Sequence, residues 1–208
     1  MKVVVTKIAA RQILRWSRNS LLAGSVLLLG YCGVIAVDAW TFQREERLQL
    51  QRRQYDQRSA AKSGNPTPSP TQSRPVLAGD LIGSIEIPRL RLSAIVVEGT
   101  EPSTLRRAVG HIPGTSLPGQ PGNTGISGHR DTFFRLLRNI QPNDLVELTS
   151  AQGEYRYLVV STQIVNPNDV SVLGAGANEV LTLVTCYPFY FVGPAPNRFV
   201  VHAERVTR

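Results

Sequence analysis

The sequence predicts an all-β domain, either a sandwich or a barrel, that follows one membrane-spanning helix. Two observations support this prediction. Near the N-terminus, residues 21–37 form an uncharged and mostly apolar run of seventeen residues, which is about the shortest run that crosses a bilayer as a helix. After residue 75, the chain consists of short apolar runs separated by glycine, proline and asparagine. This texture is typical of many short strands in a sandwich or barrel.

The flanks of the apolar run are those of a signal anchor. Trp16 and Trp40 lie on either side of it, as aromatic residues do at the two interfaces of a bilayer. A cleavable signal peptide is the alternative, but the run is long for one and no clear small-x-small cleavage site follows it. The preceding flank has five basic and no acidic residues, whereas the following flank mixes both signs. We therefore expect a basic cytoplasmic N-terminus at residues 1–19 and a transmembrane anchor at residues 20–39.

The next segment, residues 40–75, is expected to connect the anchor to the folded domain. Its first part is polar and helix-favouring, which predicts a helical stalk, and residues 63–75 are rich in proline and small polar residues, which predicts an extended tether. The formal charge of +8 belongs to residues 1–75, because residues 76–208 contain eleven basic and eleven acidic residues. The C-terminal part therefore has no basic excess that would indicate nucleic-acid binding.

Residues 76–208 are predicted to form one strand-rich domain. Two short helical pieces are expected between the strands, at residues 102–109 and 132–140, the second with Asp131 as a candidate N-cap. Seven strands are expected, at residues 82–87, 94–98, 125–128, 145–149, 155–164, 180–185 and 198–206.

Cys186 is the first residue with candidate chemistry. It ends the apolar run 180–185 and is followed at once by Tyr187-Pro188, so its thiol is expected at the end of a rigid strand beside a loop. Such a position suits a nucleophile, although an arbitrary cysteine is more often a small buried apolar residue. The other cysteine, Cys32, lies in the apolar run near the N-terminus, so the two are not expected to pair.

Two further residues occupy similar settings. His129 closes the run 124–128 and precedes a predicted helix, so it also lies where a strand meets a loop. Arg198 opens the last apolar strand, where a charge is costly unless it meets a partner or a substrate, although an arginine taken alone is also explained as a solvated strand end. A lone histidine is more often structural than not, and we interpret His111 and His202 as structural.

Three short motifs occur along the chain. They are Gly128-His129-Arg130, Thr182-Leu183-Val184-Thr185-Cys186 and Asn197-Arg198. In this order they resemble the histidine segment, the T-L-x-T-C signature and the arginine position of the sortase family. The likeness covers about residues 81–206, and it includes residues 110–115 and 118–123, which look like the stretch before the sortase histidine strand. Residues 129–134 and 186–189 look most like class D enzymes.

The resemblance implies a fold and a reaction. The fold would be a closed sortase-type β-barrel of about eight strands with short helices, formed by residues 76–208 on the extracytoplasmic side of the cell membrane. Cys186 would be the nucleophile, His129 its acid/base partner and Arg198 the cation beside the oxyanion. The reaction would be cleavage of a proline-containing sorting motif near the C-terminus of a secreted protein, through a thioacyl-enzyme. An amine of cell-wall peptide or a pilin lysine would then accept the acyl group.

The substrate groove of the family lies beside the cysteine strand. Its wall would here include residues 165–179, whose apolar members Val170, Val172 and Leu173 suit a Leu-Pro-type peptide but fit an ordinary hairpin loop equally well. Thr185, next to the cysteine, completes the expected groove. No histidine, cysteine or acidic cluster has metal-ligand spacing, and no loop carries three closely spaced acidic residues, so no cofactor or metal is expected.

Two other functions remain open at the level of sequence. The same cysteine and histidine would serve a cysteine endopeptidase that transfers the acyl group to water. A non-catalytic, membrane-tethered domain that binds a surface partner is the third interpretation, but it leaves the three strand-end residues unexplained. The lipid bilayer, a sorting-motif protein and an amine acceptor are thus the expected partners, and nucleic acid is not.

Overall fold

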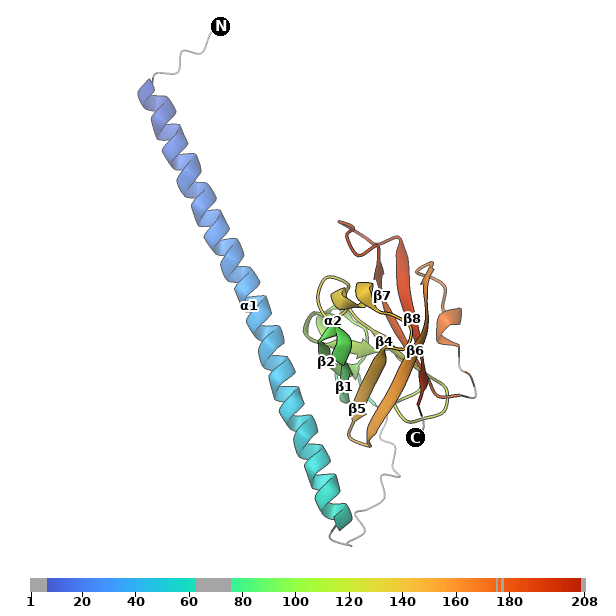
Figure 1. Cartoon of the computed structure of the whole chain (residues 1–208). Coiled ribbons are helices and arrows are strands. Elements are labelled where there is room, and N and C mark those ends of the chain that lie inside the picture. The colour runs from blue at the N-terminus through green and yellow to red at the C-terminus, as the bar shows by residue number, and fades with distance from the viewer. Residues whose placement is uncertain (1–6, 63–75, 175, 177, 207–208) are drawn as a thin grey trace. The chain divides into compact units, whose positions relative to one another are not determined.

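The computed structural model describes residues 7–62, 76–174, 176 and 178–206. The chain divides into two compact units, Met1–Thr41 and Phe42–Arg208, which we describe separately. One long helix, α1 (Lys7–Lys62), contributes residues to both (Figure 1). It passes the expected boundary between residues 39 and 40 without a break.

In the first unit, α1 presents an apolar surface to its surroundings. The side chains of Leu21, Leu27 and Leu29 are 75%, 75% and 72% exposed. Leucines exposed over successive turns are unfavourable in water and favourable in hydrocarbon. Between Gln12 and Asp56, α1 is long and apolar enough to include a transmembrane span, so the predicted N-terminal apolar helix is confirmed as a candidate anchor.

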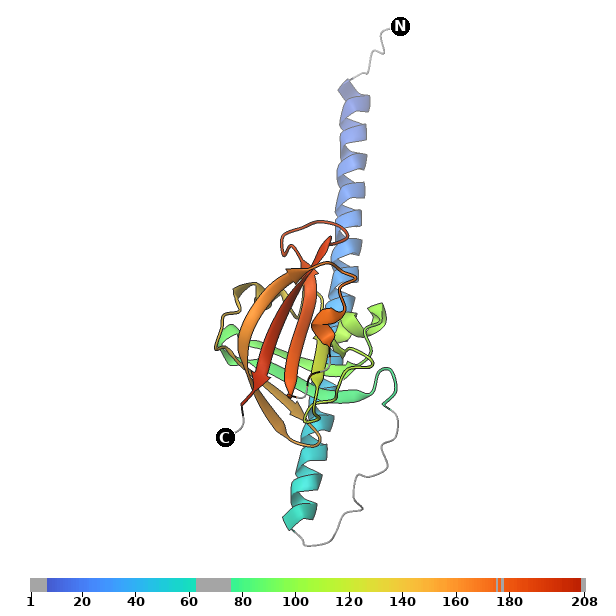
Figure 2. The same cartoon turned by 90° about the vertical axis from the view of Figure 1, so that its right-hand side faces the viewer.

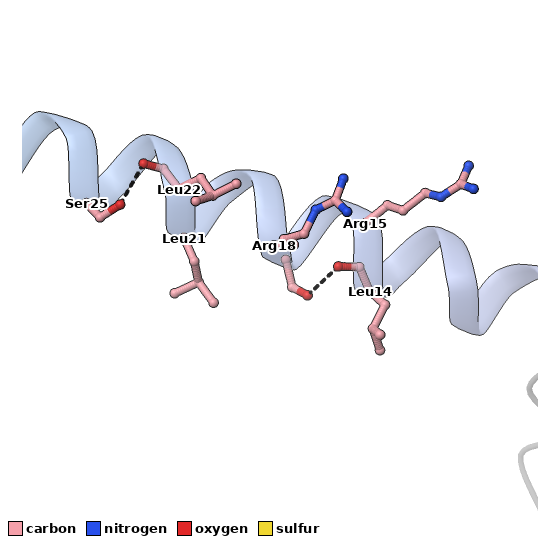
Figure 3. A pocket seen from close by; sticks show the side chains of 7 residues that line it. Leu14, Arg15, Arg18, Leu21, Leu22 and Ser25 are labelled. Carbon is pink, nitrogen blue, oxygen red and sulfur yellow. Dashed lines mark hydrogen bonds between the residues drawn. The ribbon is translucent and has the colours of Figure 1, made fainter.

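A shallow hollow lies along one side of this helix (Figure 3). The Ser17 and Ser25 hydroxyls donate hydrogen bonds back to the carbonyls of Leu14 (3.0 Å) and Leu22 (2.8 Å), so both are satisfied within the helix. The hollow is lined by residues of α1 alone, namely Leu14, Arg15, Ser17, Arg18, Leu21, Leu22 and Ser25. A single helix does not enclose a ligand, and we assign this hollow no catalytic role.

Beyond Phe42, α1 packs on the second unit's barrel. Leu50 is only 4% exposed, and Phe42 packs against the small apolar cluster that contains Ile95. The Gln43 side-chain amide accepts a hydrogen bond from the Ile95 backbone N–H (2.8 Å) and donates one to the Arg107 carbonyl (2.7 Å). The expected stalk is therefore helical, and this part of it belongs to the compact unit that contains the barrel.

Eight strands close into a barrel in the order β1-β2-β3-β4-β7-β8-β6-β5 (Figure 2). The pairs β2–β3 and β4–β7 are parallel, and the other six neighbouring pairs are antiparallel. The fold is the predicted closed eight-stranded barrel. The strands are β1 (Leu81–Ile87), β2 (Leu92–Glu98), β3 (Val109–His111), β4 (Asn123–Ser127), β5 (Leu145–Ser150), β6 (Glu154–Val165), β7 (Val180–Tyr187) and β8 (Asn197–Arg205).

The barrel interior is a continuous apolar core. Successive side chains of a strand point to opposite faces, so Leu181 and Leu183 of β7 point inward and are fully buried. Tyr157 is also fully buried, and its hydroxyl donates a hydrogen bond to Glu179 (2.8 Å). Burial and this carboxylate raise the pKa of the Tyr157 phenol far above its ordinary value. The Tyr157 hydroxyl is therefore a hydrogen-bonded polar group at the core, and it stays neutral.

Four short helical elements connect the strands. The seven expected strands are all present, but β3 was not expected, because its three residues are too few to show alternation and the expected helix at 102–109 covered its start. That helix, α2, ends two residues earlier. The elements are η1 (Pro88–Leu90), α2 (Pro102–Arg107), η2 (Arg135–Asn139) and η3 (Ser171–Leu173).

The predicted N-cap at Asp131 is wrong. Residues 130–134 form a turn, closed by the hydrogen bond from the Phe134 N–H to the His129 carbonyl (3.1 Å). The short helix η2 starts only after it, with Phe134 at the cap position and no side-chain cap. The Asp131 carboxylate is 72% exposed and lies 3.4 Å from Nε of Arg130.

Candidate active site

Strand pairing brings the segments of the three predicted catalytic residues into one row. On the β7–β8 ladder, Cys186 lies directly opposite Arg198. On the other side of β7, strand β4 runs parallel to it with Ser127 opposite Val184. Past the end of β4, the Gly128 N–H donates to the Val184 carbonyl (3.1 Å), so the segment that leads to His129 still follows the edge of β7 near Cys186. The cysteine is thus the middle member of the row, between the histidine segment and the arginine.

Cys186 and Arg198 belong to the outer side of the barrel. Leu183 on β7 and Val201 on β8 point into the core, and Cys186 and Arg198 are an odd number of residues away from them, so they point outward. Cys186 is a free thiol of intermediate exposure. A partly exposed thiol on the outside of a rigid strand is open to a substrate.

Thr185 supports the row from the inner side. It is 2% exposed, and its hydroxyl donates a hydrogen bond to the Gly128 carbonyl (2.7 Å). This bond joins the residue before the cysteine to the residue before the histidine. Gly128 has no room for a side chain, because a Cβ there would lie 2.7 Å from Cδ2 of Phe134. The expectation that Thr185 lines the substrate groove is not met, since its side chain is enclosed in the barrel.

The Arg198 side chain is held by backbone carbonyls of neighbouring residues. Its Nη1 donates to the carbonyls of Asn197 (3.0 Å) and Ala195 (3.4 Å). Among the residues that the structure describes, no carboxylate forms an ion pair with it. A guanidinium has five N–H donors, so several donors of Arg198 remain for a group bound beside Cys186.

The segment between β6 and β7 forms a wall over the outer face of β4. A Cβ on Gly125 would lie 3.1 Å from Cδ2 of Leu173, so the glycine allows η3 to lie close to the strand. Asn123 of β4 donates to the Val172 carbonyl (3.2 Å) and holds η3 there. Val172 and Leu173 are half-buried, whereas Val170 is 73% exposed. The predicted groove residues of this segment thus lie beside the strand that leads to His129.

The other two histidines are engaged elsewhere. Nδ1 of His111 lies 2.6 Å from a Glu98 carboxylate oxygen, and both residues are buried. The ring nitrogens of His202 bond the Thr182 hydroxyl (3.1 Å) and the Gln163 amide (2.9 Å), and burial lowers the pKa of this imidazole. These bonds agree with the structural interpretation of both residues.

Arg130 is a feature of the site that the sequence did not reveal. The motif identified it only as the neighbour of His129, but the structure buries it to 7% exposure against backbone carbonyls of the β7–β8 loop. Its partners come from more than fifty residues away, so no local pattern indicates them. Within the described residues, no group of three or more histidine, cysteine or acidic side chains is placed to hold a metal ion.

Comparison with known proteins gives the family. The Sortase domain model matches residues 85–206. The chain is 32% identical over 190 residues to Sortase D of Bacillus subtilis (strain 168), covering 90% of this chain and 96% of that protein. It is 27% identical over 110 residues to Sortase A of Listeria monocytogenes, covering 51% of this chain and 49% of that protein.

Solved structures share the barrel. The Sortase D5 transpeptidase of Clostridium perfringens superposes with a TM-score of 0.66 at 22% identity, covering 80% of this chain and 99% of that one. A lid mutant of Sortase A from Corynebacterium diphtheriae gives a TM-score of 0.59 at 29% identity, covering 64% and 73%. The chain therefore belongs to the sortase family of cysteine transpeptidases, with the class D character that its motifs indicate.

Proposed function

We propose that this sortase cleaves a proline-containing sorting motif near the C-terminus of secreted proteins and transfers the acyl part to an amine. The observation that supports the proposal is that Cys186 faces Arg198 on the outer side of the β7–β8 ladder, while the segment of His129 is bonded to the other edge of β7. A nucleophile between an acid/base and a cation has what acyl transfer through a thioester requires.

In the first half of the reaction, the Cys186 thiolate attacks the carbonyl carbon of the scissile peptide bond. A C–S bond forms, and the tetrahedral intermediate then expels the C-terminal part as an amine when the C–N bond breaks. His129, in its imidazolium form, donates the proton that this amine needs to leave. The products are a thioester on Cys186, a neutral His129 and the released C-terminal fragment.

In the second half, an amine attacks the thioester carbonyl. Neutral His129 takes the proton that the nitrogen loses as the new C–N bond forms, and the C–S bond then breaks to return the Cys186 thiolate. The imidazolium and the thiolate are thereby regenerated together, so no net proton is gained or lost over the cycle. An amine of cell-wall peptide or a pilin lysine is the acceptor that the family resemblance implies.

Arg198 acts on the charge that develops in both halves. Its free donors hydrogen-bond the oxyanion of each tetrahedral intermediate or the substrate backbone, and removing one such donor typically slows a reaction by about 10²- to 10³-fold. The substrate peptide lies along β4 and β7 against the wall that Val172 and Leu173 form, with Val170 at its exposed edge. No cofactor takes part in this scheme.

We also propose that the chain is a single-pass membrane protein. The basic residues 1–19 lie in the cytoplasm, residues 20–39 span the bilayer, and residues 76–208 act outside the cell membrane, where secreted substrates and acceptors are found. The exposed apolar face of α1 supports the anchor, and the asymmetry of acidic residues across it supports the orientation. A cysteine introduced at Ser59 of the Cys186→Ala chain tests the orientation, because it should react with a membrane-impermeant thiol reagent on whole cells, whereas Cys32, inside the span, should not. Reaction at position 59 only after the cells are permeabilised would reverse the orientation.

The experiment that tests the reaction traps the thioester. The full chain in detergent is incubated with a library of proline-containing pentapeptides, and intact-protein mass spectrometry should show an acyl adduct on Cys186 that is absent from Cys186→Ala. Cys32→Ala, the matched control, should acylate like the wild type, because Cys32 lies in the apolar helix. An adduct that persists in Cys186→Ala would refute the assignment of the nucleophile.

A second arm separates a transpeptidase from an endopeptidase. With a primary amine such as triglycine present, the transpeptidase should release an amine-ligated peptide in preference to the hydrolysed one. A product that stays entirely hydrolysed at saturating amine would favour transfer to water, and no adduct with any peptide would favour a non-catalytic binding domain.

A further inference from the structure

Arg130 is a buried cation that binds carbonyl groups. It is 7% exposed, and its guanidinium donates to the carbonyls of Pro188 (2.8 Å), Phe191 (2.6 Å) and Gly193 (3.2 Å). It also lies 5.9 Å from the centre of the Phe191 ring. A buried charge is costly unless it is hydrogen-bonded on several sides, and these carbonyls meet that need.

All three carbonyls belong to the loop that joins Cys186 to Arg198. This loop follows β7 and precedes β8, so its two ends carry the nucleophile and the cation of the proposed reaction. Its tip contributes little to the core, since Tyr190 is 80% exposed and Val192 is 96% exposed. Phe189 at the start of the loop packs on the core and on the Phe199 ring, but the tip buries so little surface that it depends on hydrogen bonds for a fixed shape.

Arg130 also belongs to the segment that carries the candidate histidine. Arg130 directly follows His129, so one side chain ties the histidine segment to the loop between the other two members of the row. Its nearest carboxylate, Asp131, is exposed and 3.4 Å from Nε, so the carbonyl groups are the principal partners. The burial of the guanidinium also keeps it from contact with a substrate.

We propose that Arg130 is a positioning residue that holds the β7–β8 loop and His129 in the arrangement required for acylation and aminolysis. This inference rests on the proposed function, because it assigns a purpose to the alignment of His129, Cys186 and Arg198. It predicts a defect in the chemical steps more than in substrate binding. An arginine suits the role because its planar fork reaches carbonyls in different directions, which a lysine ammonium cannot do.

The test compares Arg130→Gln and Arg130→Lys with the wild-type full chain in detergent. The substrate is whichever proline-containing pentapeptide acylates the wild type. We expect the glutamine variant to lose about 10- to 100-fold in kcat, with KM changed by less than about threefold, and the lysine variant to lose about 5- to 10-fold. Chymotrypsin should also cut beside Tyr190 and Phe191 at least about tenfold faster in the glutamine variant, because the loop opens more often.

Arg138→Gln is the matched control. Arg138 contacts the same loop, but only by lying 5.6 Å from the Tyr190 ring, and the variant should keep the wild-type kcat. If Arg130→Gln keeps the wild-type kcat as well, or loses activity only through KM, the positioning role is overturned. If the wild type itself forms no acyl-enzyme, the proposed function fails and the positioning role falls with it.

If Arg130→Gln does not fold, Gly193→Ala tests the positioning role instead. Gly193 has a φ of +107°, a conformation that strains alanine, yet a Cβ there would meet only Phe191, at 3.9 Å. The substitution therefore disturbs the loop without touching the core. A reduced kcat with an unchanged thermal midpoint supports the role of the loop, and an unchanged kcat overturns the proposal.

Discussion

Two histidines of this barrel follow a glycine, and the structure uses them differently. His111 is 2% exposed, with Nδ1 at 2.6 Å from Glu98 and Nε2 at 3.0 Å from the Thr115 hydroxyl and 3.1 Å from the Ser116 carbonyl. His129 is half-buried, and no described residue forms a hydrogen bond with its ring.

The difference separates residues that maintain the fold from residues available for chemistry. Both ring nitrogens of His111 are engaged within the fold, Nδ1 by the Glu98 carboxyl group and Nε2 by Thr115 and Ser116. A ring fixed at both nitrogens cannot pass a proton to a substrate. The ring of His129 is free to do so.

The largest effect is expected at His129, the histidine available for chemistry. His129→Ala should reduce the acylation rate by about 10³-fold, within the range that general acid–base groups contribute, and should leave the thermal midpoint nearly unchanged because no described bond is lost. Rapid-quench measurement of the acyl-enzyme gives the rate. A variant that acylates within a few fold of the wild type would show that proton transfer uses another group.

Arg198 gives the next largest effect. Arg198→Ala and Arg198→Lys should both lose about 10²- to 10³-fold in acylation rate, since the lysine keeps the charge but not the planar set of donors. The thermal midpoint of each variant is measured alongside. Near-normal rates in both would place Arg198 with the residues that only maintain the fold, and a fall in midpoint with normal rates would do the same.

His111 should show the opposite pattern. His111→Ala leaves a buried carboxyl group without its partner, which typically costs about 3 kcal/mol or more of folding free energy. Urea unfolding should reveal this loss, while the acylation rate per folded molecule stays within about threefold of the wild type. His202→Ala is the control, because its partners are Thr182 and the exposed Gln163. A His111 variant that is stable but inactive would break the comparison.

Asp144, a residue that maintains the fold, should make the stability of the barrel depend on pH. The Arg89 guanidinium hydrogen-bonds Asp144 and holds the pKa of this buried carboxyl group below its usual value. A lowered pKa in the folded state means that the stabilisation is complete above the ordinary carboxyl pKa and is lost as the pH falls through the folded-state value. The wild type should therefore lose thermal midpoint below about pH 4.

The variant Asp144→Asn checks this origin. It should have a lower midpoint at pH 7 and a shallower decline towards pH 3, because the group that titrates has been removed. Glu147→Gln is the matched control, since Glu147 pairs with Arg156 in a more exposed ion pair at 3.1 Å. Parallel declines for the wild type and Asp144→Asn would assign the acid sensitivity to other groups.

The smallest effect concerns the docked part of α1. Gln43→Ala removes the two hydrogen bonds that its amide makes with the Ile95 N–H and the Arg107 carbonyl. The expected loss is about 1 to 2 kcal/mol of unfolding free energy with unchanged acylation. Gln51→Ala on the exposed side of the same helix should be neutral. Equal stabilities of the two variants would mean that the Gln43 hydrogen bonds add nothing measurable to the stability of the barrel.

The sequence predicted seven of the eight strands for a physical reason, and the candidate site came from a family resemblance. Apolar runs such as residues 180–185 indicate buried strands directly. The motifs around His129, Cys186 and Arg198 indicate a candidate site because they resemble those of sortases. It missed features whose partners are distant. The three-residue strand β3 is defined by its neighbours, and the burial of Arg130 is defined by carbonyls of a loop with no side-chain signal. Asp131 failed as a cap because the turn after His129 delays the helix.

The docking of α1 also changes what a break in the chain would do. Residues 63–75 lie between the helix and β1 in sequence, so a protease that cuts there severs the only covalent link from the anchor to the barrel. The barrel would still be retained by Leu50, by the Gln43 amide, and by hydrogen bonds from Arg47 to Ser93 (2.8 Å) and from Gln54 to the Ser150 carbonyl (3.1 Å). A nicked molecule would thus behave as a two-piece complex, and separation of the two pieces would depend on dissociation as well as cleavage.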